Sequence, residues 1–169
     1  MPESFDELLA ECKQSAIKLE FRDLYMTSDP GYIAWQTGDL DRAVEAYADW
    51  TALARSAGAR GVRMRRARVV SEPVSEYIAF EHAVTSRVNI AAGELIRWVP
   101  RQRTSDLALP GNDVWVFDDL VVQFCFFAGD GRFTGNDVAT DPAVVKFCVS
   151  AFEAAWEHGI DHDDFRTTD

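Results

Sequence analysis

The sequence lacks the features that mark several broad classes of protein. No apolar run approaches the roughly 20 residues that span a bilayer, and the first residues, MPESFDELLAEC, are acidic where a secretory signal is basic and then apolar. The 169 residues include only three cysteines, which lie far apart among apolar neighbours. This usage excludes a disulfide scaffold and predicts reduced, buried thiols. We therefore expect a cytoplasmic protein with no membrane partner.

Sequence signatures of common catalytic sites are also missing. There is no nucleophile elbow, no glycine-rich phosphate loop and no HExxH pair of metal ligands. His158 and His162 are four residues apart, but Gly159 between them breaks the helix that would present both to one metal ion. The sequence thus predicts no metal site and no cofactor, and it names no reaction.

Positive charge is scarce overall but concentrated in the middle of the chain. Seventeen basic residues stand against 28 acidic ones, and the net charge of −11 repels nucleic acid, so we expect no direct nucleic-acid binding. Between positions 60 and 103, however, nine arginines face only four acidic residues. Arginine carries a planar fork that suits carboxylate and phosphate groups. The middle segment therefore offers a candidate anion-binding surface.

The hydrophobic pattern predicts an α/β domain. The segments 61–70 and 94–100 are typical of strands, and 73–85 between them has a helical stripe, so the three predict a βαβ unit with parallel strands. The segment VWVFDDLVVQFCFF predicts a hairpin that turns at Asp118 and Asp119. With a further short strand near 132–134, the sheet is expected to be mixed, with about four or five strands covered by helices.

The amino-terminal third is expected to be mainly helical. Apolar spacing predicts helices over about 4–14 and, as one continuous element, over 39–58. The segment 15–26 alternates like an extended chain, but its place in a sheet is uncertain. No linker or repeat divides the sequence, so residues 1–169 are expected to form a single domain, with a helical part over 1–60 and a sheet core with a carboxyl-terminal helix over 61–169.

The predicted strand 61–70 carries arginine on both of its faces. Such a strand is either an edge strand protected by charge or the lining of a polar cleft. In the cleft interpretation its arginines join those at the carboxyl end of strand 94–100, where α/β sheets usually bind ligands. Solvated arginines paired with surface carboxylates are the alternative. The candidate ligand-binding residues are Arg63, Arg65, Arg97, Trp98, Arg101 and Trp115.

Carboxylates around the predicted hairpin are the candidates for catalysis. If the protein is an enzyme, Asp113 or Asp118 could act as the base while the arginines stabilise charge. Asp118 and Asp119 are explained more simply by the hairpin turn, which aspartate favours. The turn is therefore the preferred interpretation.

Several motifs resemble a known family. The segments EYIAFE, AAGELIRWVPR, LALPGNDVWVFDD and DPAVVKFCVSAFEAAWEHGIDHDDFR are similar to an uncharacterised actinobacterial family described as a domain of unknown function. Its genes commonly lie beside helix-turn-helix regulators, so the resemblance implies a regulatory or accessory role with such a regulator as partner, and it implies no catalytic residues.

A more distant similarity is to half of a phospholipase D-like domain. This resemblance places Asp119 at the catalytic aspartate position, but Asn112 and Val114 stand where the essential histidine and lysine should be. It therefore implies a degenerate, non-hydrolytic relative that senses a ligand.

Two functions follow from these observations. The favoured one is a non-catalytic regulatory or accessory protein that binds a small anionic ligand or an acidic partner surface. The alternative is an enzyme acting on a phosphate- or carboxylate-bearing small molecule, for example in secondary metabolism. The acidic ends of the chain could bind the basic middle of a second copy in a homodimer, or shield it within one chain, and both arrangements stay open.

Overall fold

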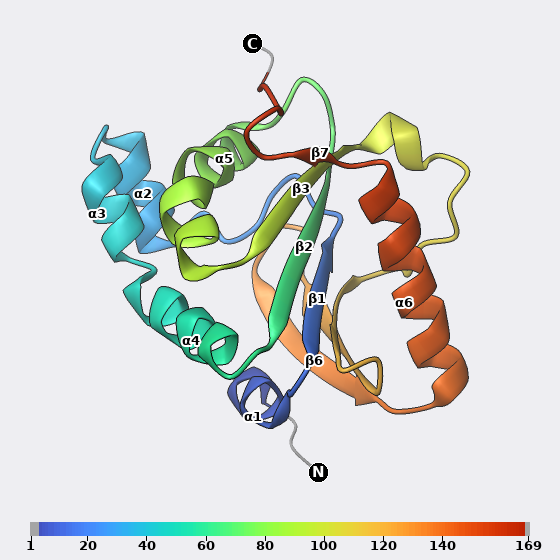
Figure 1. The fold of residues 1–169 in the computed structure, drawn as a ribbon. Helices are drawn as coiled ribbons and strands as arrows, with labels where there is room; N and C mark the ends of the chain where they lie inside the picture. The colour runs from blue at the N-terminus through green and yellow to red at the C-terminus, as the bar shows by residue number, and fades with distance from the viewer. Residues whose placement is uncertain (1–3, 168–169) are drawn as a thin grey trace.

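The protein forms a mixed α/β sheet domain, seen here in a computed structural model that describes residues 4–167 (Figure 1). The sheet has seven strands in the order β6-β5-β4-β1-β2-β3-β7. The strands are β1 (Ser15–Glu20), β2 (Arg63–Val70), β3 (Leu95–Pro100), β4 (Asp113–Phe117), β5 (Val121–Phe127), β6 (Phe133–Ala139) and β7 (Ile160–Asp161). The helices are α1 (Phe5–Glu11), α2 (Pro30–Gln36), α3 (Leu40–Glu45), α4 (Ala48–Ala59), α5 (Glu76–Val88), α6 (Pro142–Glu157) and the short 3-10 helices η1 (Ile90–Ala92) and η2 (Arg101–Thr104).

The sheet topology confirms the predicted single mixed-sheet domain and corrects its size. Strands β1, β2 and β3 run parallel in the middle, and β4, β5, β6 and β7 pair antiparallel around them. The prediction of four or five strands was wrong, because the extended segment of uncertain place became the central strand β1 and the two-residue β7 has no sequence pattern of its own. The predicted helical part over 1–60 thus also supplies the middle of the sheet.

Two predicted supersecondary units are confirmed. Strands β2 and β3 are parallel neighbours joined through α5, as the βαβ prediction required. Strands β4 and β5 form the expected hairpin, in which Asp118 and Asp119 have φ angles of 53° and 55°. Two successive positive φ angles match the twist of a tight hairpin turn. The edge-strand interpretation of β2 is wrong, since β2 lies between β1 and β3.

The long helix predicted over 39–58 is interrupted. It divides into α3 and α4 at Tyr47, whose φ of −106° and ψ of 17° leave the helical region. The Tyr47 hydroxyl donates to Asp29 at 2.5 Å, and its ring lies 6.3 Å from that of Phe80. The helical periodicity continues across the break and carries no signal for it, so the tertiary contacts of Tyr47 decide where the chain bends.

The helices cover the two faces of the sheet unequally. Helix α6 packs alone on one face, over an apolar core that includes Ile17, Val69, Val114 and Phe152. Helices α2 to α5 lie on the other side of the sheet (Figure 1). None of the helices within residues 4–167 combines the length and the apolar character that spanning a bilayer requires. The two faces also differ in chemistry, because the α6 face of the central strands is mainly aliphatic and the opposite face carries buried charge.

Candidate functional site

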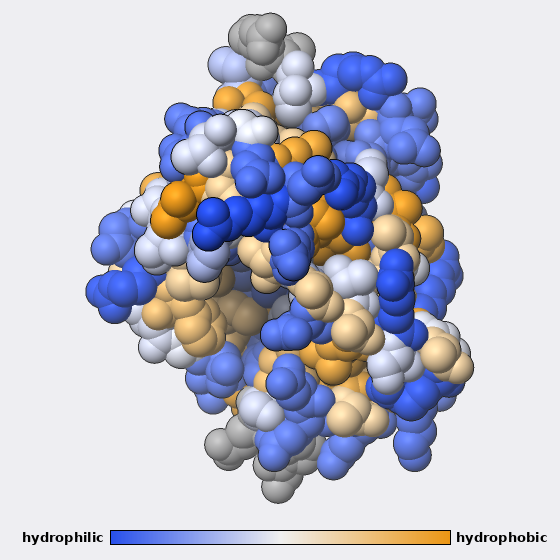
Figure 2. All heavy atoms as spheres, turned by 90° about the vertical axis from the view of Figure 1, so that its left-hand side faces the viewer, coloured by the Kyte–Doolittle hydropathy of each residue, from blue (hydrophilic) through white to orange (hydrophobic). Residues whose placement is uncertain are grey.

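A pocket lies between the sheet and the helices on the charged side. Its volume is about 320 Å³, at the lower end of the roughly 300–1,000 Å³ typical of small-molecule sites. We call it the central pocket. It is lined by Lys18, Glu20, Tyr25, Asp29, Tyr47, Trp50, Arg66, Arg68, Tyr77, Phe80, Glu81, Val84, Val88, Asn89, Asp113, Trp115 and Phe127. Figure 2 shows the side of the molecule formed by α2 and α3, where hydrophilic and hydrophobic side chains alternate around a hollowed surface.

Strand alternation places charged side chains on the floor of the central pocket. In β1, Lys18 and Glu20 are two residues apart and therefore share a face, and in β2 the same holds for Arg66 and Arg68. The strands pair in a register that sets Lys18 opposite Arg66 and Glu20 opposite Arg68. All four residues are less than one tenth exposed to solvent. The middle of the sheet thus carries buried charge on this face.

Most of this charge is paired. Arg66 donates to Glu20 and to Glu94, each at 2.6 Å, and Arg68 donates to the second oxygen of Glu20 at 3.1 Å. Asn89 donates to the other oxygen of Glu94 at 2.7 Å. We call Glu20, Arg66, Arg68 and Glu94 the buried ion network. Buried charges are tolerated when they are paired and hydrogen-bonded in this way.

The network fixes the charge state of Glu20. Burial alone would raise the pKa of this carboxyl, but Arg66, Arg68 and Lys18 outweigh burial and lower the pKa to about 2. Glu20 is therefore ionised at neutral pH, and it serves as the counter-ion of both arginines.

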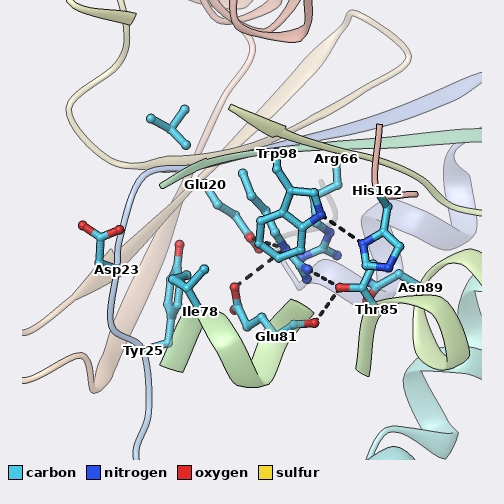
Figure 3. A network of polar contacts seen from close by, with 12 residues as sticks. Glu20, Asp23, Tyr25, Arg66, Ile78, Glu81, Thr85, Asn89, Trp98 and His162 are labelled. Atoms are coloured by element: carbon cyan, nitrogen blue, oxygen red, sulfur yellow. Dashed lines mark hydrogen bonds and ion pairs between the residues drawn. The ribbon is translucent and has the colours of Figure 1, made fainter. Parts of the chain in front are cut away.

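Glu81 on α5 differs from the other acids of the central pocket. Its Oε2 atom is buried without a hydrogen-bond partner and lies 3.8 Å from Arg68 Nε. Its side chain is 14% exposed. Burial and the charge of Glu20 raise the pKa of Glu81 to about 8, against the lowering effect of Arg68. Figure 3 shows Glu81 reaching from α5 toward the buried ion network, where the dashed line marks its ion pair with Arg68.

A second acid, Asp113, is held at the start of β4. Its carboxylate accepts hydrogen bonds from the Tyr25 hydroxyl and from the backbone N–H of Phe21, the latter at 3.0 Å. Burial raises the pKa of Asp113, and the charge of Glu20 raises it further. Gly131 lies against the backbone of Tyr25 with a φ of 89°, and a side chain there would overlap the Tyr25 carbonyl group. The turn before β6 thus fixes Tyr25 on Asp113.

Aromatic rings form the remaining walls. The guanidinium group of Arg66 lies 5.4 Å from the Trp50 ring and 5.2 Å from the Trp115 ring, as in cation–π pairs. On α5, Tyr77 and Phe80 meet edge to face with their centroids 5.5 Å apart. The pocket therefore combines carboxylates, cations and aromatic faces within one small volume.

The structure does not bring the predicted arginine site together. Arg65 and Arg97 lie on the α6 face of the sheet, where Arg65 donates to Glu153 at 2.6 and 3.0 Å and Arg97 donates to Asp161 at 2.8 Å. Arg63 is exposed at the start of β2. The alternation that sets these residues on one side sets Arg66 and Arg68 on the other, facing the central pocket.

Arg101 and the two tryptophans of the prediction lie elsewhere. Arg101 donates to Ser71 at 3.1 Å and to the Phe21 carbonyl, on the loops beyond the strand ends. Trp98 is fully buried and donates from Nε1 to His162 at 3.1 Å (Figure 3). Of the six predicted residues, Trp115 lines the central pocket.

The two candidate aspartates have separate places. Asp113 lines the central pocket. Asp118 lies in the hairpin turn, and its carboxylate accepts backbone N–H groups from Lys13 at 2.8 Å, Gln14 at 2.7 Å and Ser15 at 2.9 Å. These three N–H groups lower the pKa of Asp118 although burial opposes them. The Asp118 carboxylate thus links the hairpin to the start of β1 and stabilises the fold at that point.

Several residues of the central pocket were not singled out from the sequence. The available signal was the pair of charged residues at alternate positions within SAIKLE, which places Lys18 and Glu20 on the same face as each other. Nothing in the sequence shows that Tyr25 or Glu81 meets them. Between residues 4 and 167, no group of three histidine, cysteine, aspartate or glutamate side chains is arranged to hold a metal ion.

A histidine pair borders the buried ion network. The rings of His82 and His162 are 4.6 Å apart, and His82 Nε2 is buried without a hydrogen-bond partner. Burial lowers the pKa of both histidines, and each ring also lies near Arg68. Both are therefore neutral at neutral pH, and the protonated form is disfavoured in the folded state.

We expect this pair to make the protein less stable as the pH falls. A histidine with a lowered folded-state pKa contributes its full stability above its ordinary pKa and loses it as the unfolded state gains a proton at lower pH. Replacing His82 with phenylalanine should reduce the loss of stability between pH 7.5 and pH 5, measured by urea unfolding. The exposed His158, replaced with glutamine, is the control, and equal slopes for wild type and His82→Phe would contradict the prediction.

Comparisons with known proteins assign a family and no activity. A family model described as "Domain of unknown function (DUF6879)" matches residues 3–167. No curated protein matches the sequence. Among solved structures, the chain is similar to TrmBL2, an archaeal chromatin protein described as having a novel mode of DNA binding, with 17% identity and a TM-score of 0.45. The match covers 92% of this chain and 48% of TrmBL2, so the chain spans about half the length of that protein.

Proposed function

We propose that this chain, which belongs to the DUF6879 family, is a non-catalytic binding module that holds a small organic ligand in the central pocket. The observation that carries the proposal is a pocket of about 320 Å³ whose lining combines carboxylates, arginines and aromatic rings. A few placed polar groups among apolar walls are typical of sites that orient a ligand. The regulatory or accessory role, the helix-turn-helix partner, the actinobacterial setting and the phospholipase D-like ancestry remain predictions from the resemblance.

The central pocket is a better candidate than the arginine cleft expected from the sequence. An anion there would have to compete with Glu20 and Glu94, which already occupy Arg66 at 2.6 Å, and with Glu20 on Arg68. On the α6 face, Arg65 and Arg97 are likewise engaged by carboxylates, as described above. The proposal therefore retains a ligand-binding module and moves its site across the sheet.

An enzyme remains the second candidate because of one observation. A carboxyl group whose pKa is raised to about 8, like that of Glu81, is suited to exchange protons near neutral pH. Asp113 would be the base of the original hypothesis because it lines the central pocket, whereas the Asp118 carboxylate accepts three backbone N–H groups at the hairpin. If Asp113→Asn abolishes turnover of the ligand and leaves its affinity unchanged, the enzyme proposal replaces the binding proposal.

Filling the central pocket tests the binding proposal. Val84 is a buried residue of α5 that lines the pocket, and Val84→Phe should place a ring inside it. We expect the wild-type protein, purified gently from its own host, to retain a small molecule in native mass spectrometry, and we expect Val84→Phe to lose it. A ligand at 100 times its Kd would stabilise the fold by about 2.7 kcal/mol, so its loss should also remove a thermal shift.

The control is Ile90→Phe, which adds the same ring at an exposed position just beyond the same helix. It should retain the ligand. The proposal is wrong if the wild type retains no small molecule and no compound of a metabolite collection raises its unfolding temperature. It is also wrong if Val84→Phe folds and retains as much ligand as the control.

A further inference from the structure

The central pocket holds more acidic than basic groups. Of the described side chains that line it or belong to the buried ion network, three are basic and five are carboxylic acids. Fully ionised, this set would carry a net charge of −2. The basic residues are Lys18, Arg66 and Arg68, and the acids are Glu20, Asp29, Glu81, Glu94 and Asp113. A buried excess of negative charge is costly unless a proton or a bound cation compensates it.

The excess is concentrated at Glu81. Glu20, Glu94 and Asp29 are each bonded through both carboxylate oxygens, and Asp113 accepts from a hydroxyl and a backbone N–H. The Oε2 atom of Glu81 has no hydrogen bond, and its nearest cation, Arg68 Nε, is 3.8 Å away. Glu81 is thus the acid of this pocket with an oxygen free to accept from a ligand.

Aromatic rings lie beside this carboxyl. Helical spacing on α5 puts Tyr77, Phe80 and Val84 on the stripe that carries Glu81, and all four line the pocket. Tyr25 approaches Tyr77 with ring centroids 5.9 Å apart. A carboxylate beside aromatic faces is the combination that recognises organic ammonium ions, because the ring faces attract the cation and the carboxylate neutralises it.

From this geometry we infer that the ligand is a small organic ammonium ion whose nitrogen pairs with Glu81 while its carbon atoms pack against Tyr77 and Phe80. The inference rests on the proposed binding function and names its ligand class. It opposes an anionic ligand, because the arginine side chains that face the pocket already hold carboxylates. Since protonated Glu81 must ionise to pair with the cation, binding releases a proton and becomes tighter as the pH rises through the pKa of about 8.

The test uses ligands that differ in charge and share a shape. Choline, which is cationic at every pH, is compared with its uncharged analogue in which carbon replaces nitrogen, and benzylammonium is compared with benzyl alcohol and benzoate. Isothermal calorimetry of the full chain should show binding of the ammonium ions at least tenfold tighter than binding of their partners. The affinity for choline should rise at least tenfold from pH 6 to pH 9.

Glu81→Gln should weaken choline binding at pH 9 by at least tenfold and remove its pH dependence. The matched control is Glu157→Gln, an exposed glutamate at the end of α6 on the opposite face, which should change neither. Circular dichroism of both variants checks that they fold, and the small molecule retained by the wild type is identified by its mass and charge.

The outcomes separate the inference from the proposed function. A retained ligand that is an amine, or ammonium binding that Glu81→Gln abolishes, supports the inference. A retained ligand that is neutral or anionic overturns the inference but not the proposed binding function. So does equal affinity for the ammonium ions and their uncharged or anionic analogues. Absence of binding by every ammonium probe overturns the inference alone, and if the wild type also retains nothing and no compound of the metabolite collection raises its unfolding temperature, both are wrong.

Discussion

Replacing Arg66 with methionine is expected to lower the free energy of unfolding by about 3–5 kcal/mol, the usual effect of removing one partner of a buried ion pair. Arg66 lies between two carboxylates at 2.6 Å, and the side chain of its partner Glu94 is fully buried. Methionine would fill much of the space between Trp50 and Trp115, but it would leave Glu94 without a cation. Urea unfolding at pH 7 measures the change.

Two further variants assign the loss to the unpaired charge. Arg63→Met changes the same residue type on the same strand at an exposed position, and it should cost less than about 0.5 kcal/mol. Adding Glu94→Gln to Arg66→Met removes the uncompensated carboxylate and should recover at least about 1 kcal/mol. A loss below about 1 kcal/mol for Arg66→Met, or no recovery in the double variant, would show that the buried ion network contributes little.

Asp118→Ala is expected to lower the free energy of unfolding by about 3 kcal/mol. Each hydrogen bond to a charged acceptor is worth roughly 1.5–3 kcal/mol, but water partly replaces the bonds that the exposed N–H groups lose. The carboxylate accepts three successive backbone N–H groups between α1 and β1. Because the pKa of Asp118 is lowered in the folded protein, this stability should be present above the ordinary aspartate pKa and lost as the pH falls through the folded-state value.

The neighbouring residue provides the control for backbone strain. Asp119 has nearly the same φ, 55° against 53°, so Asp119→Ala carries the same penalty for a left-handed alanine, without removing those three hydrogen bonds. The difference between the two variants in thermal unfolding measures the carboxylate alone. Equal destabilisation of both would mean that the turn conformation, and not the bonds to the start of β1, accounts for the cost.

The elements that sequence patterns predicted correctly are those whose pattern is local. The β4–β5 hairpin has two aspartates between two apolar runs, and the parallel pair β2 and β3 is marked by a helical stripe between two strands. The break at Tyr47 and the central place of β1 depend on contacts made far along the chain, such as that of Tyr47 with Asp29 and the pairing of β1 with β4. Local periodicity carries no information on these contacts.

The site was missed for a related reason. Strand alternation showed that Arg63 and Arg65 face away from Arg66 and Arg68, but it could not show which side would be covered by α6 and which would face the central pocket. That choice is made by Glu20 from β1 and by Glu94, which lies 28 residues beyond Arg66. The type of residue in the site was therefore predictable, while its face and its partners were not.

The pairing of β1 with β2 also bears on how the chain finds a single arrangement. Glu20 lies opposite Arg68, and Lys18 lies opposite Arg66. If β1 slipped by one residue, its charged side chains would turn into the aliphatic layer beneath α6, and a slip by two would keep the faces but misalign Glu20 with both arginines. Both kinds of misregistered sheet are thus less stable than the native one, so the charges that shape the pocket also specify the strand register during folding.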